Sequence, residues 1–393
     1  MSDTQTTVAI RRLLPPLGAA TALIVIFVTV LSIPLATAHD LGLTEAETVG
    51  WIMGLYGIPG LLTLVLAIRY RQPLLVTGNV FLLIFIASLG REIAWPELVG
   101  AVIVSGLAVL VLGPLGVISR LTAWLPSPIV YGLLAGAVLH FFVDLFSAVG
   151  NEPLMVGGTL AAYVLGRRFT EPRIPALLPA LVVGIALAAI TGEIGSAPSE
   201  VTLAPAFTAP EFSFQSIATV APVAIVLITV QANVPSLVFL RAQGYAPPEG
   251  GLNAMSGLGT AAGSFMGPVG VSLSLPATAL CAGPDAGPRS HRHWAALIAG
   301  GASLAIGLAA GLATRIAEVL PAALLTGLVG LAVLGVLAAA LGNAVKGPLV
   351  LGPLFAFAIS QSNLEIIELG PFFWALVGGL AISWLLERDG WQA

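Results

Sequence analysis

The feature that most constrains the fold is a succession of apolar stretches of helical length, separated by short polar connections. At roughly 20 residues per membrane crossing, the sequence contains about fourteen such segments. Helices are expected here because lipid provides no water to hydrogen-bond the backbone N–H and C=O groups, and a helix pairs these groups internally. We therefore predict an all-α polytopic membrane protein with segments near 14–38, 48–68, 73–89, 95–115, 126–149, 153–166, 175–194, 214–240, 252–265, 267–284, 290–311, 320–342, 346–362 and 370–387.

Composition supports lipid as the solvent for most of the surface. Of the 393 residues, 58% are hydrophobic and 9% are charged, whereas a soluble domain carries about 25% charged residues. We therefore expect the lipid bilayer, and no nucleic acid, as a partner. The single cysteine, Cys281, excludes an intrachain disulfide and a cysteine-based metal cluster. We expect no metal and no cofactor.

The distribution of charged residues predicts the orientation in the membrane. Cytoplasmic connections of membrane proteins are enriched in Lys and Arg. If the N-terminus is cytoplasmic, 13 of the 15 Lys and Arg residues lie inside, and only Arg91 and Arg315 lie outside. One misplaced segment would reverse every later connection and destroy this alternation. We therefore expect both termini in the cytoplasm.

An internal repeat relates the two halves of the chain. Residues 125–139 and 320–334 are identical at seven of fifteen positions, at an offset of 195 residues. The same offset maps two further features, 180–190 onto 375–385 and Pro73 onto Pro268. Agreement of three features at one offset is much stronger than any single match, because apolar sequences give chance identities.

The repeat predicts an inverted architecture. Each half contains seven segments, an odd number, so the second half enters the membrane from the opposite side. Inverted repeats are typical of secondary transporters. We predict a first seven-span repeat over 1–200 and a second, inverted seven-span repeat over 201–393.

Two paired segments are the candidate substrate site. Transporters of this kind bind substrate near the membrane midplane, at interrupted helices in matching positions of the two halves. Segment 73–89 begins with Pro73 and carries Gly78, and segment 267–284 begins with Gly267-Pro268. Both segments indicate an extended stretch followed by a half-helix. Facing half-helix N-termini would direct free N–H groups at an anion, although small residues also allow close helix packing. The predicted binding residues are Thr77, Gly78, Asn79, Gly270, Val271 and Ser272.

Segment 214–240 carries two amides, Gln231 and Asn233, beside Pro235. An unpaired amide in lipid is costly. Either side chain is a candidate for substrate contact, and the alternative is interhelical hydrogen bonding beside the proline kink.

Asp144 is a carboxylate inside the predicted segment 126–149, and His140 precedes it by four residues on the same helical face. An intramembrane Asp/His pair is a proton-relay hypothesis. The alternative is that Asp144, near the outer end of its segment, is simply hydrated or paired.

Several short motifs follow one another in a specific order along the chain. They are Gly42-Leu43-Thr44 with Trp51, Tyr70-Arg71-Gln72-Pro73, Asn233-Val234-Pro235, Arg241-Ala242-Gln243-Gly244-Tyr245 followed by Pro247-Pro248, and Cys281-Ala282-Gly283-Pro284-Asp285. In this order the chain resembles the benzoate/proton symporter (BenE) family over nearly its whole length. It departs from that family where Ala232 separates Gln231 from Asn233, and where Gly267–Gly270 lacks a histidine.

The resemblance implies a fold and a function. The fold is the seven-plus-seven inverted repeat of uracil permeases and sulfate-type carriers, often dimeric, here with a core domain from 14–115 and 214–311 and a gate domain from 126–194 and 320–387. The function is uptake of a small organic anion, a benzoate-like aromatic carboxylate, with a proton as coupling ion. Transport would proceed by alternating access in the inner membrane of a bacterium. The glutamates that uracil permeases use in segments 8 and 10 are absent, which leaves the coupling residue open.

Other transport functions are alternatives. The protein could carry another small anion or a neutral solute, or it could be a channel. A membrane enzyme would need a catalytic constellation, yet the histidines, His39, His140, His291 and His293, form no HExxH motif and no Cys/His cluster. We therefore expect a transporter and no enzyme.

Overall fold

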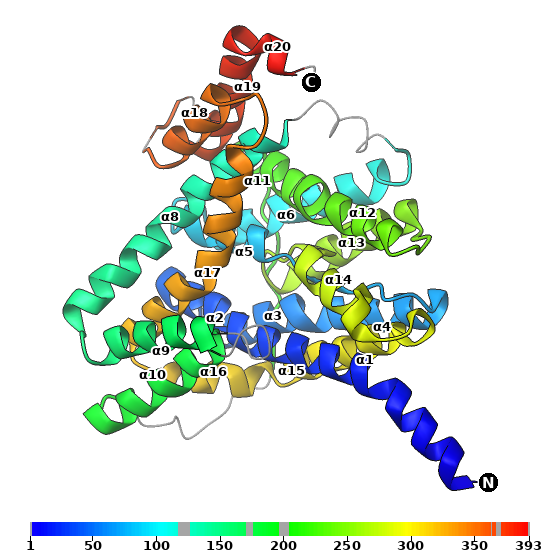
Figure 1. Cartoon of the computed structure of the whole chain (residues 1–393). Coiled ribbons are helices and arrows are strands. Elements are labelled where there is room, and N and C mark those ends of the chain that lie inside the picture. Colours follow the sequence, from blue (N-terminus) through cyan, green and yellow to red (C-terminus); the bar gives the residue numbers. More distant parts are fainter. Residues whose placement is uncertain are drawn as a thin grey trace.

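The computed structural model describes residues 2–116, 126–169, 176–195, 204–362, 364–366 and 371–391. Within these ranges the regular secondary structure is helical apart from one short two-stranded sheet (Figure 1). The predicted boundary between residues 200 and 201 lies outside the described residues, as do Arg120 and Arg173, two of the basic residues that predicted the orientation.

Every predicted apolar segment contains a helix. The first half holds α1 (Ser2–Val30), α2 (Ser32–Leu41), α3 (Glu45–Ile52), the π-helix η1 (Met53–Gly57), α4 (Ile58–Tyr70), β1 (Val76–Gly78), α5 (Val80–Leu89), α6 (Trp95–Leu112), α8 (Ser127–Asn151), α9 (Met155–Phe169) and α10 (Leu177–Thr191).

The second half begins with α11 (Phe214–Val226), and a second π-helix follows it. Its further elements are η2 (Leu227–Asn233), α12 (Val234–Ala242), α13 (Glu249–Gly263), η3 (Ser264–Met266), β2 (Val271–Leu273), α14 (Leu275–Ala282), η4 (Pro284–Ala286), η5 (Arg289–His291), α15 (His293–Leu308), α16 (Ala310–Val319), α17 (Ala322–Ala344), α18 (Leu351–Ser360), α19 (Pro371–Leu386) and α20 (Arg388–Trp391). Six continuous helical stretches among the described residues are long and apolar enough to cross a membrane.

The elements repeat at the offset found in the sequence. Three pairs of elements begin 195 residues apart, namely β1 and β2, α5 and α14, and α8 and α17. The break between α1 and α2 at Leu31 corresponds to Val226, which immediately precedes η2. Both first segments of the two halves are therefore irregular at the same place.

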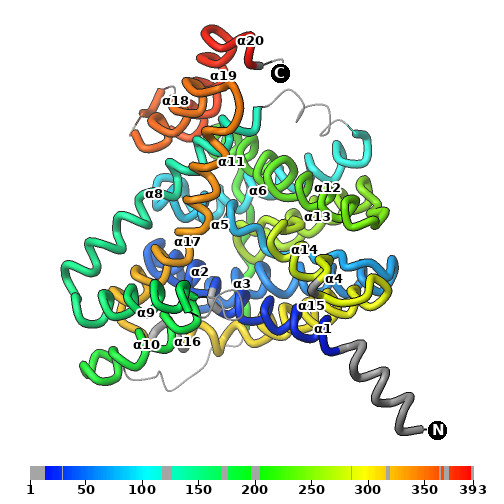
Figure 2. Tube along the Cα trace, in the orientation of Figure 1, coloured from blue at the N-terminus to red at the C-terminus, as the bar shows by residue number. Residues whose placement is uncertain are grey.

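Helices from the two halves pack against one another. α8 lies along α17, and α18 packs on α8 and α19 (Figure 1). In the other part of the molecule α6 packs on α11 and α13, while α15 packs on α4 and runs beside α1 (Figure 2). The halves are interleaved, so each buried cluster contains side chains from both.

The two short strands form a sheet inside the larger of the two buried hydrophobic clusters. They pair antiparallel, with Thr77 opposite Ser272. The outward-facing N–H groups of three strand residues donate to side chains of neighbouring helices: Val76 to Thr63 Oγ1 (3.0 Å), Val271 to Thr260 Oγ1 (2.9 Å) and Leu273 to Asn233 Oδ1 (2.8 Å). Non-helical backbone at membrane depth needs such partners because no water is present to replace them.

Candidate substrate site

A cavity of about 410 Å³ lies where α1, η1, β1, α5, α14, α15 and α17 meet. Most of its wall is apolar, with Phe27 from α1, Phe81 from α5 and Val336 from α17. None of the lining residues that the structure describes carries a charge. The cavity is therefore suited to an apolar body of a small molecule.

The starts of both half-helices reach this cavity. Val80 and Phe81 begin α5, and Ser274 and Pro276 flank the start of α14, and all four line the wall. The first N–H groups of a helix have no intrahelical acceptor, and the N-terminus carries the positive end of the helix dipole. The apolar cavity thus has one region suited to an anionic group.

Two hydroxyl groups add side-chain donors to this region. Thr77, in β1, and Ser274, at the N-cap of α14, both line the cavity. Neither hydroxyl has a hydrogen-bond partner in the described part of the chain. Thr77 is only 9% exposed, but it lines the cavity. Both are free to donate to a ligand.

The predicted site residues of the first paired segment divide into two groups. Thr77 and Gly78 line the cavity, whereas Asn79 is 2% exposed and does not. Asn79 Nδ2 donates to Ser272 Oγ (2.9 Å) and to the Leu227 carbonyl (3.2 Å), and its Oδ1 accepts from Leu82 N (2.8 Å). Asn79 therefore caps α5 and joins it to the second half of the chain.

The predicted residues of the second paired segment lie behind the cavity wall. The Gly270 carbonyl accepts a hydrogen bond from Asn79 N (2.7 Å), and the Val271 N–H donates to Thr260 Oγ1. Ser272 is 1% exposed and accepts from Asn79. A Cβ added at Gly270 would meet Leu82 Cδ2 at 2.5 Å, so glycine allows β2 to approach α5 here. Direct contact of these residues with substrate stays a prediction.

The two amides of η2 also lie outside the cavity lining. Asn233 is fully buried, and its Nδ2 donates to Asn253 Oδ1 (2.9 Å) and Ser256 Oγ (3.2 Å) while its Oδ1 accepts from Leu273. Gln231 is 8% exposed, and its Oε1 has no hydrogen-bond partner among the described residues. Asn233 is committed to the fold, whereas Gln231 retains a free acceptor.

The proton-coupling candidates lie on α8, away from this cavity. Asp144 is exposed and His140 is half-buried, with its ring against Phe141. Neither lines the cavity. A role in proton coupling stays a prediction.

Of the predicted site residues, only Thr77 and Gly78 line the cavity. The lining residues that the sequence did not predict include Ser274, Tyr56, Ser303 and Gly335. Tyr56 Oη donates to the Phe27 carbonyl (3.0 Å), and Ser303 Oγ donates to the Tyr56 carbonyl (2.8 Å). The signal for Gly335 was present in the sequence, because Ala332, Gly335, Val336 and Ala339 share one helical face.

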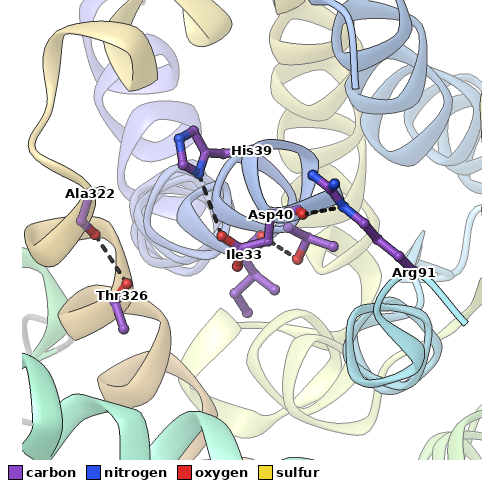
Figure 3. Close-up of polar contacts among 7 residues, drawn as sticks. Ile33, His39, Asp40, Arg91, Ala322 and Thr326 are labelled. Carbon is purple, nitrogen blue, oxygen red and sulfur yellow. Dashed lines mark hydrogen bonds and ion pairs between the residues drawn. The ribbon is translucent and has the colours of Figure 1, made fainter. Parts of the chain in front are cut away.

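Nearer its start, α17 packs against α2. Leu35 of α2 and Leu325 of α17 are both buried, and both line an apolar cavity of about 380 Å³ and a smaller one of about 150 Å³. The smaller one is also lined by His39, beyond which Arg91 Nε donates to the Asp40 carbonyl (3.1 Å; Figure 3). The α2–α17 contact lies about 15 Å along α17 from Gly335, at 1.5 Å per residue.

Solved structures of two transporters share this fold. The chain aligns with SLC26A9 at a TM-score of 0.66 and 14% identity, covering 96% of this chain and 66% of that one. It also aligns with the transmembrane domain of a cyanobacterial bicarbonate transporter, BicA, at a TM-score of 0.56 and 16% identity, covering 94% and 97% of the two chains. At such identities the likeness establishes the fold alone.

Sequence comparison identifies relatives of matching length. The chain is 28% identical over 344 residues to a benzoate membrane transport protein of Acinetobacter baylyi, covering 86% of both chains. It is 27% identical to the inner membrane protein YdcO of Escherichia coli, covering 86% of this chain and 87% of that one. The profile of the family described as "Benzoate membrane transport protein" (BenE) matches residues 15–385. This match confirms the resemblance seen in the motifs: the chain is a membrane transport protein and belongs to the BenE family.

Proposed function

We propose that the protein is a secondary active transporter that takes up a small aromatic carboxylate of the benzoate type in symport with a proton. The observation that carries this proposal is the apolar cavity that ends on two half-helix N-termini. A benzoate-like anion has the matching division, with a flat apolar ring and one charged group. Membership of the BenE family supports the same substrate class.

The carboxylate is proposed to lie between the starts of α5 and α14. There the Thr77 and Ser274 hydroxyls and the free N–H groups of the first turns supply hydrogen bonds. Charge-assisted hydrogen bonds are about twice as strong as neutral ones. The ring would lie against Phe27 and Phe81, where aromatic rings favour offset or edge-to-face contact.

Alternating access is proposed to arise between the core domain, 14–115 and 214–311, and the gate domain, 126–194 and 320–387. With this division the cavity lies between the two proposed domains, since α17 falls in the proposed gate and the other lining elements fall in the proposed core. Movement of α17 relative to α1 and α2 would open one side of the cavity and close the other. The proposed orientation places both termini in the cytoplasm of a bacterial cell.

Proton coupling has two candidate routes. Asp144 and His140 would carry the proton on α8, or the substrate itself would cross as the protonated acid. The described cavity lining contains no carboxylate and no histidine, which favours a carrier for the proton other than a side chain in direct contact with the substrate.

Uptake by the full chain in proteoliposomes tests the proposal. Radiolabelled benzoate should accumulate above its equilibrium level when an inward proton gradient is imposed, and unlabelled benzoate should compete. Benzamide, a neutral analogue of the same shape, should compete poorly because it lacks the carboxylate charge. Equal competition by benzamide would indicate a carrier of neutral solutes, and uptake that never exceeds equilibrium would indicate a channel.

A further inference from the structure

The cavity is larger than a single benzene ring requires. A cavity of about 150 Å³ with an apolar lining is enough to bind benzene. The cavity here measures about 410 Å³, so a benzoate ring would leave a large part of it unfilled. Unfilled apolar volume forgoes dispersion contacts, and a ligand with a larger apolar body would gain them.

Gly335 accounts for part of this space. It lies on the face of α17 that lines the cavity, together with Ala332, Val336 and Ala339. A Cβ added at Gly335 has no heavy atom within 4 Å. Gly330 on the same helix differs, because a Cβ there would meet Leu145 Cβ at 2.6 Å. Gly330 serves helix packing, whereas Gly335 leaves open volume in the cavity.

The remaining polar groups of the lining do not provide for a second charge. The hydroxyl hydrogens of Tyr56 and Ser303 are committed to the carbonyls of Phe27 and Tyr56. No described lining residue is cationic. A second carboxylate on the ring would be buried without compensation, which is strongly unfavourable. The site therefore favours one anionic group on an extended apolar body.

We propose that the substrates of this protein include monoanionic aromatic carboxylates larger than benzoate, such as those with two fused rings, and that the side chain at position 335 sets the size limit. This inference rests on the proposed function, because it places the carboxylate at the starts of α5 and α14. The extra ring or apolar substituent then occupies the space beside Gly335.

Binding measurements on the purified full-length protein test this inference with three probes: benzoate, naphthoate and terephthalate. The wild type should bind naphthoate at least as tightly as benzoate. Terephthalate should bind at least about tenfold more weakly than benzoate, because its second carboxylate finds no partner. In Gly335→Leu, naphthoate affinity should fall by about tenfold or more, as expected when a pocket loses room for apolar groups, while benzoate affinity should stay within about twofold.

Gly342→Leu is the matched control. Gly342 lies on the same helix, an added Cβ there also meets nothing within 4 Å, and it is not part of the cavity lining. This variant should bind all three probes like the wild type. Retained benzoate binding shows that Gly335→Leu is folded. Benzoate binding without naphthoate binding in the wild type, or equal effects of Gly335→Leu on both ligands, would overturn the inference and leave the proposed function intact. Failure of the wild type to bind benzoate would instead overturn the proposed function.

Discussion

At the scale of single residues, hydroxyls that have no partner within the protein differ from those that are hydrogen-bonded within the fold. The Thr77 and Ser274 hydroxyls line the cavity without partners among the described residues, whereas the Ser272 hydroxyl, in β2, accepts a hydrogen bond from Asn79 Nδ2. Polar groups buried in lipid need a partner. We propose that a bound ligand supplies this partner for Thr77 and Ser274.

Removing either free hydroxyl should weaken binding without unfolding the protein. A hydrogen bond to a charged group contributes about 1.5–3 kcal/mol, so Thr77→Val and Ser274→Ala should each raise the Kd for benzoate by roughly tenfold to a hundredfold. Calorimetric titration measures this change. Thr21→Val is the control, because the Thr21 hydroxyl bonds its own helix at Leu17 and lies outside the cavity. An unchanged Kd in both variants would remove these hydroxyls from the site.

Glu387, just beyond the end of α19, has a structural role that depends on its charge. Its carboxylate accepts hydrogen bonds from the N–H groups of Val350 (2.6 Å), Leu351 (2.7 Å) and Gly352 (3.0 Å), and thereby caps α18. Burial alone would raise the pKa of this carboxyl, but the three backbone donors and the Ser383 hydroxyl together lower it below 4.5.

Because the folded-state pKa of Glu387 is lowered, its charge stabilises the fold at pH values above 4.5. This stabilisation is lost as the pH falls through the folded-state pKa. Glu387→Gln should therefore lower the Tm at neutral pH. The loss of a helix cap costs about 0.5–2 kcal/mol of folding free energy. The difference from the wild type should shrink in strongly acidic buffer. A Tm difference that is independent of pH would show that the charge is not what stabilises α18.

At the scale of elements, two buried amides hold the half-helices in place, and one of them, Asn79, crosses between the halves of the chain. Asn79 joins α5 to β2 and η2, and Asn233 joins η2 to β2 and α13. The π-helical turn of η2 ends at Asn233. These bonds fix the separation of the two N-termini that face the cavity.

Asn233→Leu should therefore destabilise the whole protein and not only reduce its affinity. The substitution would leave the Leu273 N–H and the polar groups of Asn253 and Ser256 without this partner, at a cost of about 1–3 kcal/mol for each buried group. Thermal unfolding in detergent measures the loss. Asn343→Leu is the control, since Asn343 is exposed, donates to Ala339 within its own helix and accepts only from the exposed Lys346 beside the helix end. Normal stability with lost binding would instead assign Asn233 to the substrate.

At the scale of the whole molecule, the contact between α2 and α17 is where alternating access should be visible. Leu35 on α2 and Leu325 on α17 line the same two cavities. Cross-linking Leu35→Cys to Leu325→Cys should stop transport, because α2 and α17 would no longer separate. The native Cys281 is fully buried and should not interfere.

A matched cross-link inside one proposed domain provides the control. Leu145→Cys and Gly330→Cys join α8 to α17, where the two positions are in contact. Both helices belong to the proposed gate domain, so this cross-link should leave transport active. Transport that continues with α2 fixed to α17 would show that these elements move together.

Much of the architecture follows from the sequence alone. Hydropathy placed a helix in every segment that the structure describes, and the 195-residue offset anticipated the matching positions of β1 and β2. Pro and Gly at the starts of the paired segments indicated the extended stretches. These features are local, because the length of an apolar run and the lack of an N–H or a Cβ act within a few residues.

The tertiary structure alone decided which polar residues face the cavity. Thr77 and Asn79 are two positions apart, and both side chains are polar. Thr77 nevertheless faces the cavity, whereas Asn79 donates a hydrogen bond to Ser272, 193 residues away. A buried polar group needs a partner, and sequence does not say whether that partner is another part of the chain or a substrate. The open space at Gly335 likewise depends on helices distant in sequence, since a glycine in a membrane helix serves packing or a cavity according to what lies opposite it.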